Sequence, residues 1–140
     1  DDYEEGTWTP VLTFATPGDK NVVYSVQVGW YVKVGQKATI GYNIQTSTFT
    51  HTTASGNCQI TGVPFASMVL TGYTAQGAVQ FAGVTKANYT NISCEIESSS
   101  AILTFAGSGS AQGASNVAAA DMPTTGTVVM KGTNTYRAVA

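Results

Sequence analysis

Apolar and polar side chains alternate with a period of two along most of the chain. The alternation is clearest over residues 26–34, 38–45 and 92–96. Because neighbouring side chains on a strand point to opposite faces, this pattern predicts strands with one face on a core. Shorter runs between turn residues predict further strands at 8–14, 67–73, 78–84, 101–106 and 127–131. The pattern therefore predicts an all-β fold, an antiparallel β-sandwich of jelly-roll type with about eight to nine strands and little helix.

Helical signals are weak. Only residues 111–120 are rich in alanine, and Gly113 and Ser115 interrupt them, so we expect a long loop with at most a helical turn. No shift of composition and no long repeat divides the 140 residues, which have a mass of 14.5 kDa. These features predict a single domain over residues 1–140.

Several predicted strands carry apolar or aromatic side chains on both faces. Trp30 is followed by Tyr31, Val22 by another valine, and Val69 by Leu70. A two-layer sandwich usually leaves one face of each sheet polar. A second apolar face needs cover from another subunit or domain, so the pattern suggests an oligomer.

Charge is scarce. Charged residues make up 10% of the chain, against about 25% in typical soluble domains. The net charge is −2, which gives no electrostatic case for nucleic acid or for an anionic membrane. Hydrophobic residues reach 43%, enough for a core, and no apolar run approaches the roughly 20 residues that span a bilayer. We therefore expect an ordered domain with neither a nucleic-acid partner nor membrane insertion.

The start of the chain is acidic. Half of the eight acidic residues lie within residues 1–5. We expect residues 1–7 to be a solvated lead-in or linker end; the alternative is a junction that packs on a preceding domain or on a symmetry mate. The chain has no initiating methionine and no secretory signal, so we expect a processed product or a piece of a longer protein.

The two cysteines are too few for a four-cysteine zinc site or a disulfide framework. Cys58 and Cys94 each share a strand face with isoleucine: Ile60 in the first case, Ile92 and Ile96 in the second. We expect two buried, reduced thiols that act as small hydrophobic groups. A disulfide between neighbouring strands is the alternative.

Catalytic patterns are nearly absent. The chain has one histidine and no Gly-x-Ser-x-Gly motif. Glu95 and Glu97 share a strand face, where we expect them to be solvated rather than to form the carboxylate pair of a glycosidase. Asp19 and Asp121 lie in predicted loops without the spacing of a calcium site. We therefore predict no catalytic residues, no metal, no cofactor and no enzymatic activity.

The remaining candidate chemistry is sugar binding. Aromatic rings stack on pyranose rings, and amide groups pair with sugar hydroxyls. Tyr89 stands between Asn88 and Asn91 in one predicted loop, and His51 lies in a threonine-rich loop. These four residues are our candidates for a glycan site, with ordinary exposed loops as the alternative.

Four segments resemble a known family. The run D-Y-E-E-G-T-W-T-P occupies residues 2–10, and a G-x-Y-x-K-x-G segment occupies residues 29–35. A G-x-P-F segment follows at 62–65, and residues 132–137 are similar to a G-T-Y-R ending. In this order they resemble the C-terminal domain of many bacteriophage tail fibres and tailspikes. We call them the four landmark segments. The opening run is the most specific of them.

The resemblance covers residues 2–137 but is not complete. The closing segment contains two extra residues, Asn134 and Thr135, or else matches in a shifted position. The resemblance therefore assigns no role to Tyr136 and Arg137. It implies a β-sandwich at the distal end of a trimeric fibre or spike, where such domains act as trimerisation caps, receptor-binding tips or carbohydrate-binding modules. Depolymerase activity in these proteins usually lies in an upstream β-helix, which this chain lacks.

Together these observations predict a non-enzymatic distal domain of a phage tail fibre or tailspike. Its expected roles are homotrimer formation and host attachment through recognition of a bacterial surface polysaccharide or lipopolysaccharide. The expected location is the virion, after synthesis in the host cytoplasm. A purely structural trimer cap without a ligand is the alternative, and a hydrolase is a third, weaker one.

Overall fold

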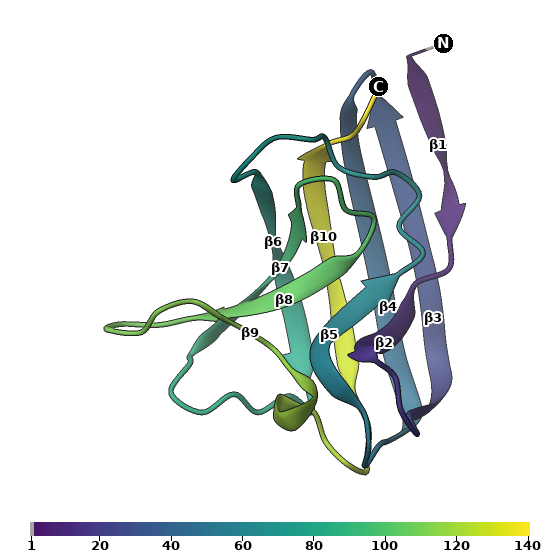
Figure 1. Ribbon diagram of the computed structural model, residues 1–140. Coiled ribbons are helices and arrows are strands. Elements are labelled where there is room, and N and C mark those ends of the chain that lie inside the picture. Colours follow the sequence, from purple (N-terminus) through teal and green to yellow (C-terminus); the bar gives the residue numbers. More distant parts are fainter. Residues whose placement is uncertain (1) are drawn as a thin grey trace.

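The chain forms an antiparallel β-sandwich with ten strands, as the computed structural model shows for residues 2–140 (Figure 1). The strands are β1 (Tyr3–Trp8), β2 (Val11–Thr16), β3 (Asn21–Val34), β4 (Lys37–Thr50), β5 (Ser55–Thr61), β6 (Thr74–Ala82), β7 (Asn91–Glu97), β8 (Leu103–Ser108), β9 (Ser115–Asn116) and β10 (Val129–Arg137). A single 3-10 turn, η1 (Ala119–Asp121), lies in the alanine-rich segment. The predicted fold class is confirmed. Within residues 2–140 no helix is long and apolar enough to cross a membrane.

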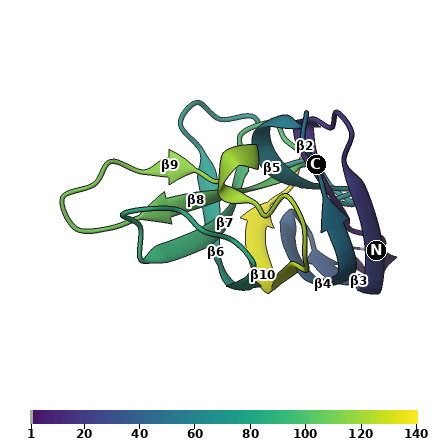
Figure 2. The same ribbon diagram turned by 90° about the horizontal axis from the view of Figure 1, so that it is seen from below.

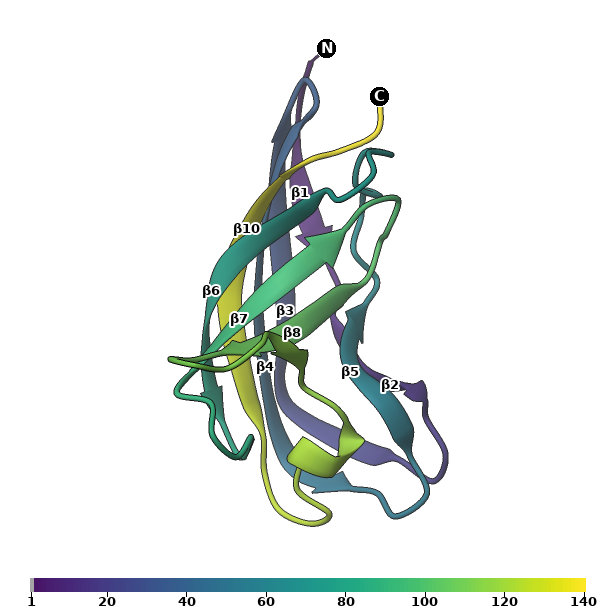
Figure 3. The ribbon, with the colours of Figure 1, turned by 60° about the vertical axis from the view of Figure 1, so that its left-hand side comes forward.

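The strands follow the order β1-β3-β4-β10-β6-β7-β8-β5-β2, and β9 pairs with β8. Strand β6 joins the two layers, because Thr74–Ala78 pair with β7 whereas Val79–Ala82 pair with β10. Sheet A comprises β1, β3, β4 and β10, and sheet B comprises β7, β8, β5 and β2 with β9 at its side. Strands β7 and β8 cross obliquely over sheet A (Figures 1 and 3).

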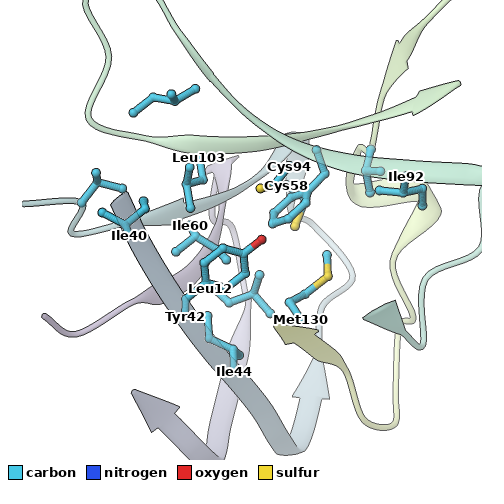
Figure 4. Packing of buried hydrophobic residues seen from close by; sticks show 14 of the residues in the cluster. Leu12, Ile40, Tyr42, Ile44, Cys58, Ile60, Ile92, Cys94, Leu103 and Met130 are labelled. Atoms are coloured by element: carbon cyan, nitrogen blue, oxygen red, sulfur yellow. The ribbon is translucent and has the colours of Figure 1, made fainter. Parts of the chain in front are cut away.

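The core lies between the two sheets (Figure 4). It contains the alternating apolar residues of β4 and β7, as their period predicted. Cys58 and Cys94 are both buried and free, which confirms the reduced thiols and makes the disulfide alternative wrong. Burial raises the pKa of Cys58 to about 12, so this thiol stays protonated near neutral pH.

The acidic opening is a strand rather than a solvated lead-in. Residues 3–7 belong to β1, which pairs antiparallel with β3; Asp1 lies outside the described residues. The first landmark segment therefore lies against the second. Two residue pairs interlock: the ring of Tyr31 covers Gly6, and the indole of Trp8 covers Gly29. A side chain at either glycine would occupy the space of the ring.

The third landmark segment packs against Tyr31 of the second, and the fourth packs against the third. The ring of Phe65 packs edge-on against Tyr31, with ring centroids 5.1 Å apart, and Lys33 Nζ lies 5.3 Å from the centre of the Phe65 ring. The Tyr136 hydroxyl donates to the Phe65 carbonyl at 2.7 Å. Asn134, one of the two extra residues, is buried and donates to the Ala75 carbonyl at 3.1 Å. The landmark segments thus form one packed unit.

Between residues 26 and 34, strand β3 turns its valines away from the core, whereas Val22 near the start of the strand packs against the core. Its inward residues are Gln27, Gly29, Tyr31 and Lys33, because they pair with the buried residues of β4. From the alternation alone, the apolar residues at 26–34 would form the buried face, and the structure places them outward. The reason for the inversion is that Trp8 and Phe65 already fill the inner side of β3.

Two other predicted strands differ in the structure. The run 8–14 divides into β1 and β2 at Thr9 and Pro10, because proline has no N–H for a central ladder. The segment 67–73 forms no strand, apart from one bridge between Ser67 and Ala138. It crosses the end of the sandwich instead, with hydrogen bonds to several different elements.

Candidate functional site

An open cleft of about 540 Å³ lies at one end of the sandwich. This is the end where β1 begins and β10 ends (Figure 1, top). The turn between β3 and β4, the segment before β6 and the end of β10 form its walls. We call it the Arg137 cleft; it is lined by Val34, Gln36, Lys37, Tyr73, Thr135, Tyr136 and Arg137. Its volume falls in the range of about 300–1,000 Å³ that is typical of small-molecule sites.

Hydrogen bonds hold the polar groups of this cleft in place. Arg137 Nε donates to Gln36 Oε1 at 2.7 Å, and the backbone N–H of Arg137 donates to the Tyr73 hydroxyl at 2.8 Å. Lys37 stands directly opposite Arg137 in the β4–β10 ladder. The lining residues include two cations, an amide, two phenols and a threonine hydroxyl, but no carboxylate, imidazole or thiol. The lining therefore offers cationic and hydrogen-bonding groups to a ligand.

Asn91, one of the predicted glycan residues, lines a second and smaller groove. This groove of about 290 Å³ lies where β6 and β7 separate, and its polar lining is formed by Gln76, Asn91 and Ser93. The Ser93 hydroxyl donates to Gln76 Oε1 at 2.8 Å. Asn91 is exposed at the start of β7, so its amide group faces solvent.

Tyr89 is half-buried and has structural contacts. Its hydroxyl donates to the carbonyl of Gly113 at 2.8 Å, in the β8–β9 hairpin that projects from the side of the sandwich (Figure 2). Its ring covers Gly107, and Lys86 Nζ lies 5.3 Å from the ring centre. Gly107 pairs with the buried Ile92, so this ring lies on the opposite face of sheet B from Asn91. Asn88 is exposed in the turn beside Tyr89. The structure therefore does not gather the predicted residues into one site.

His51 is buried, which corrects our expectation that it lies on an exposed loop. Its side chain is only 5% exposed. The imidazole packs between Phe14 and Phe49, at centroid distances of 5.0 and 5.9 Å. Neither ring nitrogen has a hydrogen-bond partner among residues 2–140. The physical reason is that β4 extends through Thr50 and carries the next residue into the core, so this ring has no free face for a sugar.

Replacing His51 with leucine is expected to stabilise the domain by about 1 kcal/mol, because it removes a buried polar group without a partner. Leucine is also similar in size to histidine, which limits strain. Urea denaturation followed by far-UV circular dichroism measures the change. As a control, His51→Asn keeps a buried polar group and should be destabilising. Lower stability in His51→Leu than in the wild type would show that the imidazole contributes a stabilising interaction.

Two acidic residues in loops, Asp19 and Asp121, have structural partners. The Asp19 carboxylate accepts hydrogen bonds from the Thr52 hydroxyl and from the N–H groups of Thr52 and Thr53, which hold the pKa of Asp19 well below its usual range. Asp121 pairs with Lys86 at 2.9 Å. Residues 2–140 contain no group of three or more His, Cys, Asp or Glu side chains that could hold a metal ion.

Glu95 is buried, which corrects the expectation that it is solvated. It accepts a hydrogen bond from Gln76 Nε2 at 2.7 Å, and the Thr104 hydroxyl lies 3.4 Å away. Glu97 on the same strand is exposed. The two carboxylates therefore occupy different environments, and polar neighbours on β6 and β8 cover the first of them.

A row of exposed apolar side chains runs along the outer face of sheet A. We call it the outer apolar stripe; its exposed members are Tyr3, Val23, Val28, Trp30 and Val34. Val28 is 55% exposed and Trp30 is 45% exposed. The Trp30 indole lies flat over Gly41 on the neighbouring strand, where any side chain would overlap it. The stripe is therefore a shaped surface rather than a set of isolated residues.

The fold of this sandwich has a counterpart among solved structures. No family model and no curated protein matches the chain. Among solved structures it is similar to the Dettilon tailspike protein (gp208), with a TM-score of 0.63 and 15% sequence identity. The match covers 94% of this chain but 23% of that chain. The likeness shows that nearly the whole chain shares the fold of one part of a tailspike.

Sequence reasoning missed the Arg137 cleft. Its residues come from three places in the chain, around positions 34–37, 73 and 135–137. The one local signal was the ending of the fourth landmark segment, where Tyr136 and Arg137 had no assigned role. Only the pairing of β4 with β10 places Arg137 beside Lys37.

Proposed function

We propose that this chain is a distal domain of a phage tail fibre or tailspike and that it forms homotrimers through the outer apolar stripe. The observation that carries the proposal is the exposure of Val28 and Trp30 on a sandwich that already has a complete core. Contiguous apolar surface of this kind usually marks an interaction site. The fold that the chain shares with one part of a tailspike supports a place in the virion. Synthesis in the cytoplasm of the bacterial host is part of this proposal.

The chemistry of the stripe favours a second copy of the chain as its partner. Buried aromatic side chains contribute strongly to interfaces, and each buries about 150–250 Å². Trp30 can be buried in an interface without a large entropic cost, because its ring already packs flat over Gly41. Around Trp30, the outward neighbours Thr7, Gly41 and Thr133 are uncharged, so association there desolvates few ions.

We further propose that the domain is not an enzyme and takes part in host attachment by binding a bacterial surface polysaccharide or lipopolysaccharide. The Arg137 cleft and the groove beside Asn91 are the surfaces that support this role. Both are open and contain amide or hydroxyl groups suited to sugar hydroxyls.

A second candidate function is a structural trimer cap without a ligand. The observation that favours it is that two of the residues predicted to bind a glycan have structural contacts instead. His51 lies in the core, and the Tyr89 hydroxyl donates to the Gly113 carbonyl. A labelled domain that adsorbs to host cells, and is displaced by their purified surface polysaccharide, would support recognition. The absence of adsorption by the intact trimer would favour the structural cap.

Trimer formation is expected to fail in Val28→Lys. The lysine would place a charge inside the proposed interface, whereas in the monomer it would point into solvent and leave folding intact. Sedimentation equilibrium should give a trimer mass for the wild type and a monomer mass for Val28→Lys at micromolar concentration. The matched control is Val69→Lys: Val69 is 74% exposed but lies outside the stripe, so this variant should remain a trimer. A wild-type domain that is monomeric at this concentration would contradict the proposal.

A further inference from the structure

Two positive charges face each other in the Arg137 cleft without an acidic partner. Arg137 and Lys37 are direct partners in the β4–β10 ladder. Like charges at opposite positions destabilise a pair of strands. The one ion pair within residues 2–140 joins Lys86 to Asp121, so no described carboxylate neutralises either cation of the cleft. Local conflicts of this kind are expected where a site serves a function.

The Arg137 side chain is held ready for a ligand. Its Nε is already bonded to Gln36 Oε1, which fixes the plane of the guanidinium and leaves its two terminal NH₂ groups as donors. The same bond leaves the Gln36 amide NH₂ group as a further donor. Tyr73 is fixed in turn, because its hydroxyl accepts the backbone N–H of Arg137. Donors that are already positioned lose less entropy when a ligand binds.

We propose that the Arg137 cleft binds the carboxylate of an acidic sugar, a uronic or sialic acid unit of a surface glycan. The proposal rests on the proposed role in host attachment, for which it names the ligand class. A carboxylate matches the planar donor pattern of Arg137 and adds a charge contact with Lys37. The Tyr73 ring supplies an apolar wall, and Gln36 and Thr135 supply partners for hydroxyl groups. A cleft of about 540 Å³ is larger than an inorganic anion requires.

The cleft borders the proposed trimer interface. Val34 belongs to both the cleft and the outer apolar stripe. The bound sugar would therefore lie at the margin between protomers, and the oligomeric state has to be measured for every variant used to test the site.

The binding test uses the purified domain and NMR titration. The probes are glucuronate, galacturonate and N-acetylneuraminate, with glucose and galactose as neutral counterparts and inorganic phosphate as the control anion. At least one acidic sugar should bind saturably, about 10- to 100-fold more tightly than its neutral counterpart, and more weakly as salt is added. Phosphate that binds as tightly as the best sugar would overturn the assignment to a saccharide. The absence of saturable binding by any of the three acids would overturn the site.

Substitutions of single residues test whether the acidic sugar binds in the Arg137 cleft. Arg137→Gln and Lys37→Gln should each weaken binding of the acidic sugar, the first by about 10- to 100-fold. The matched control is Lys131→Gln, which removes a cation from the same strand but outside the cleft and should leave the affinity unchanged. Without ligand, Lys37→Gln should melt no lower than the wild type, because it relieves the repulsion. Unchanged affinity in Arg137→Gln would overturn the assignment.

Cell adsorption separates this inference from the proposed function. If Arg137→Gln remains a trimer and still adsorbs to host cells like the wild type, the cleft assignment fails but host recognition stands. If the wild type binds the acidic sugar through Arg137 but does not adsorb to cells, the cleft assignment stands and the role in attachment fails.

Discussion

Trp8→Ala is expected to lower the free energy of unfolding by about 3–5 kcal/mol, the usual cost of truncating a buried aromatic residue to alanine. The indole is nearly buried and lies flat against Gly29. Its N–H points to the carbonyl oxygens of Trp30 and Gly41, both at 3.2 Å. Removing the ring therefore opens a cavity beneath β3 and leaves the inner side of the β1–β3 ladder without support.

Urea denaturation followed by circular dichroism is the appropriate measurement, because Trp30 would still dominate the fluorescence. Carrying out the comparison in the Val28→Lys background removes any contribution from association. Trp8→Phe is the matched control: it keeps most of the buried ring but loses the N–H, so it should cost less than Trp8→Ala. A loss of less than about 1 kcal/mol in Trp8→Ala, the size of one ordinary hydrogen bond, would show that β1 does not depend on the indole.

Gly77→Ala is expected to destabilise the domain by about 2–3 kcal/mol, although it adds a single carbon atom. Gly77 lies on β6 where this strand passes from sheet B to sheet A. A Cβ atom there would overlap the Thr133 carbonyl oxygen and would come within 3.0 Å of the Cys94 sulfur. The Thr133 oxygen is a backbone atom, so no side-chain rotation removes the overlap. Strand β6 would therefore have to move away from β10.

Gly113→Ala is the control for this substitution. Nothing lies within 4 Å of the position that a Cβ atom would take at Gly113, and this glycine does not have a positive φ. The change should be neutral or slightly stabilising, because alanine reduces the freedom of the unfolded chain. Thermal denaturation of the two variants, side by side with the wild type, measures the difference. Equal melting temperatures would mean that the crossing of β6 and β10 tolerates the extra carbon.

The local pattern predicted the buried side correctly where only one face of a strand carries large apolar side chains. The alternation over residues 38–45 and 92–96 predicted both the strands and their buried sides, because β4 and β7 lie in the interior of their sheets. It failed for β3, where both faces carry large side chains. Which face turns inward there depends on Trp8 and Phe65, which are distant in sequence, and a period of two contains no such information.

The candidate site depended even more on long-range pairing. His51 has the sequence context of a polar loop, yet packing against Phe14 and Phe49 buries it. The acidic opening looked like a linker, yet it forms the edge strand β1, where charged side chains discourage pairing with further chains. In both cases neighbouring residues in the sequence were polar, and the decisive contacts were made by other strands.

The sequence by itself determined the fold class, the positions of most strands, the burial of both cysteines and the order of the four landmark segments. These features follow from side-chain alternation and turn residues, which are local properties. Only the tertiary structure decided that the landmark segments pack together around Tyr31, that the valines at 26–34 face outward, and that Lys37 and Arg137 meet in one cleft. The physical reason is that strand register and the choice of inner face arise from contacts between residues up to a hundred positions apart, which no local pattern encodes.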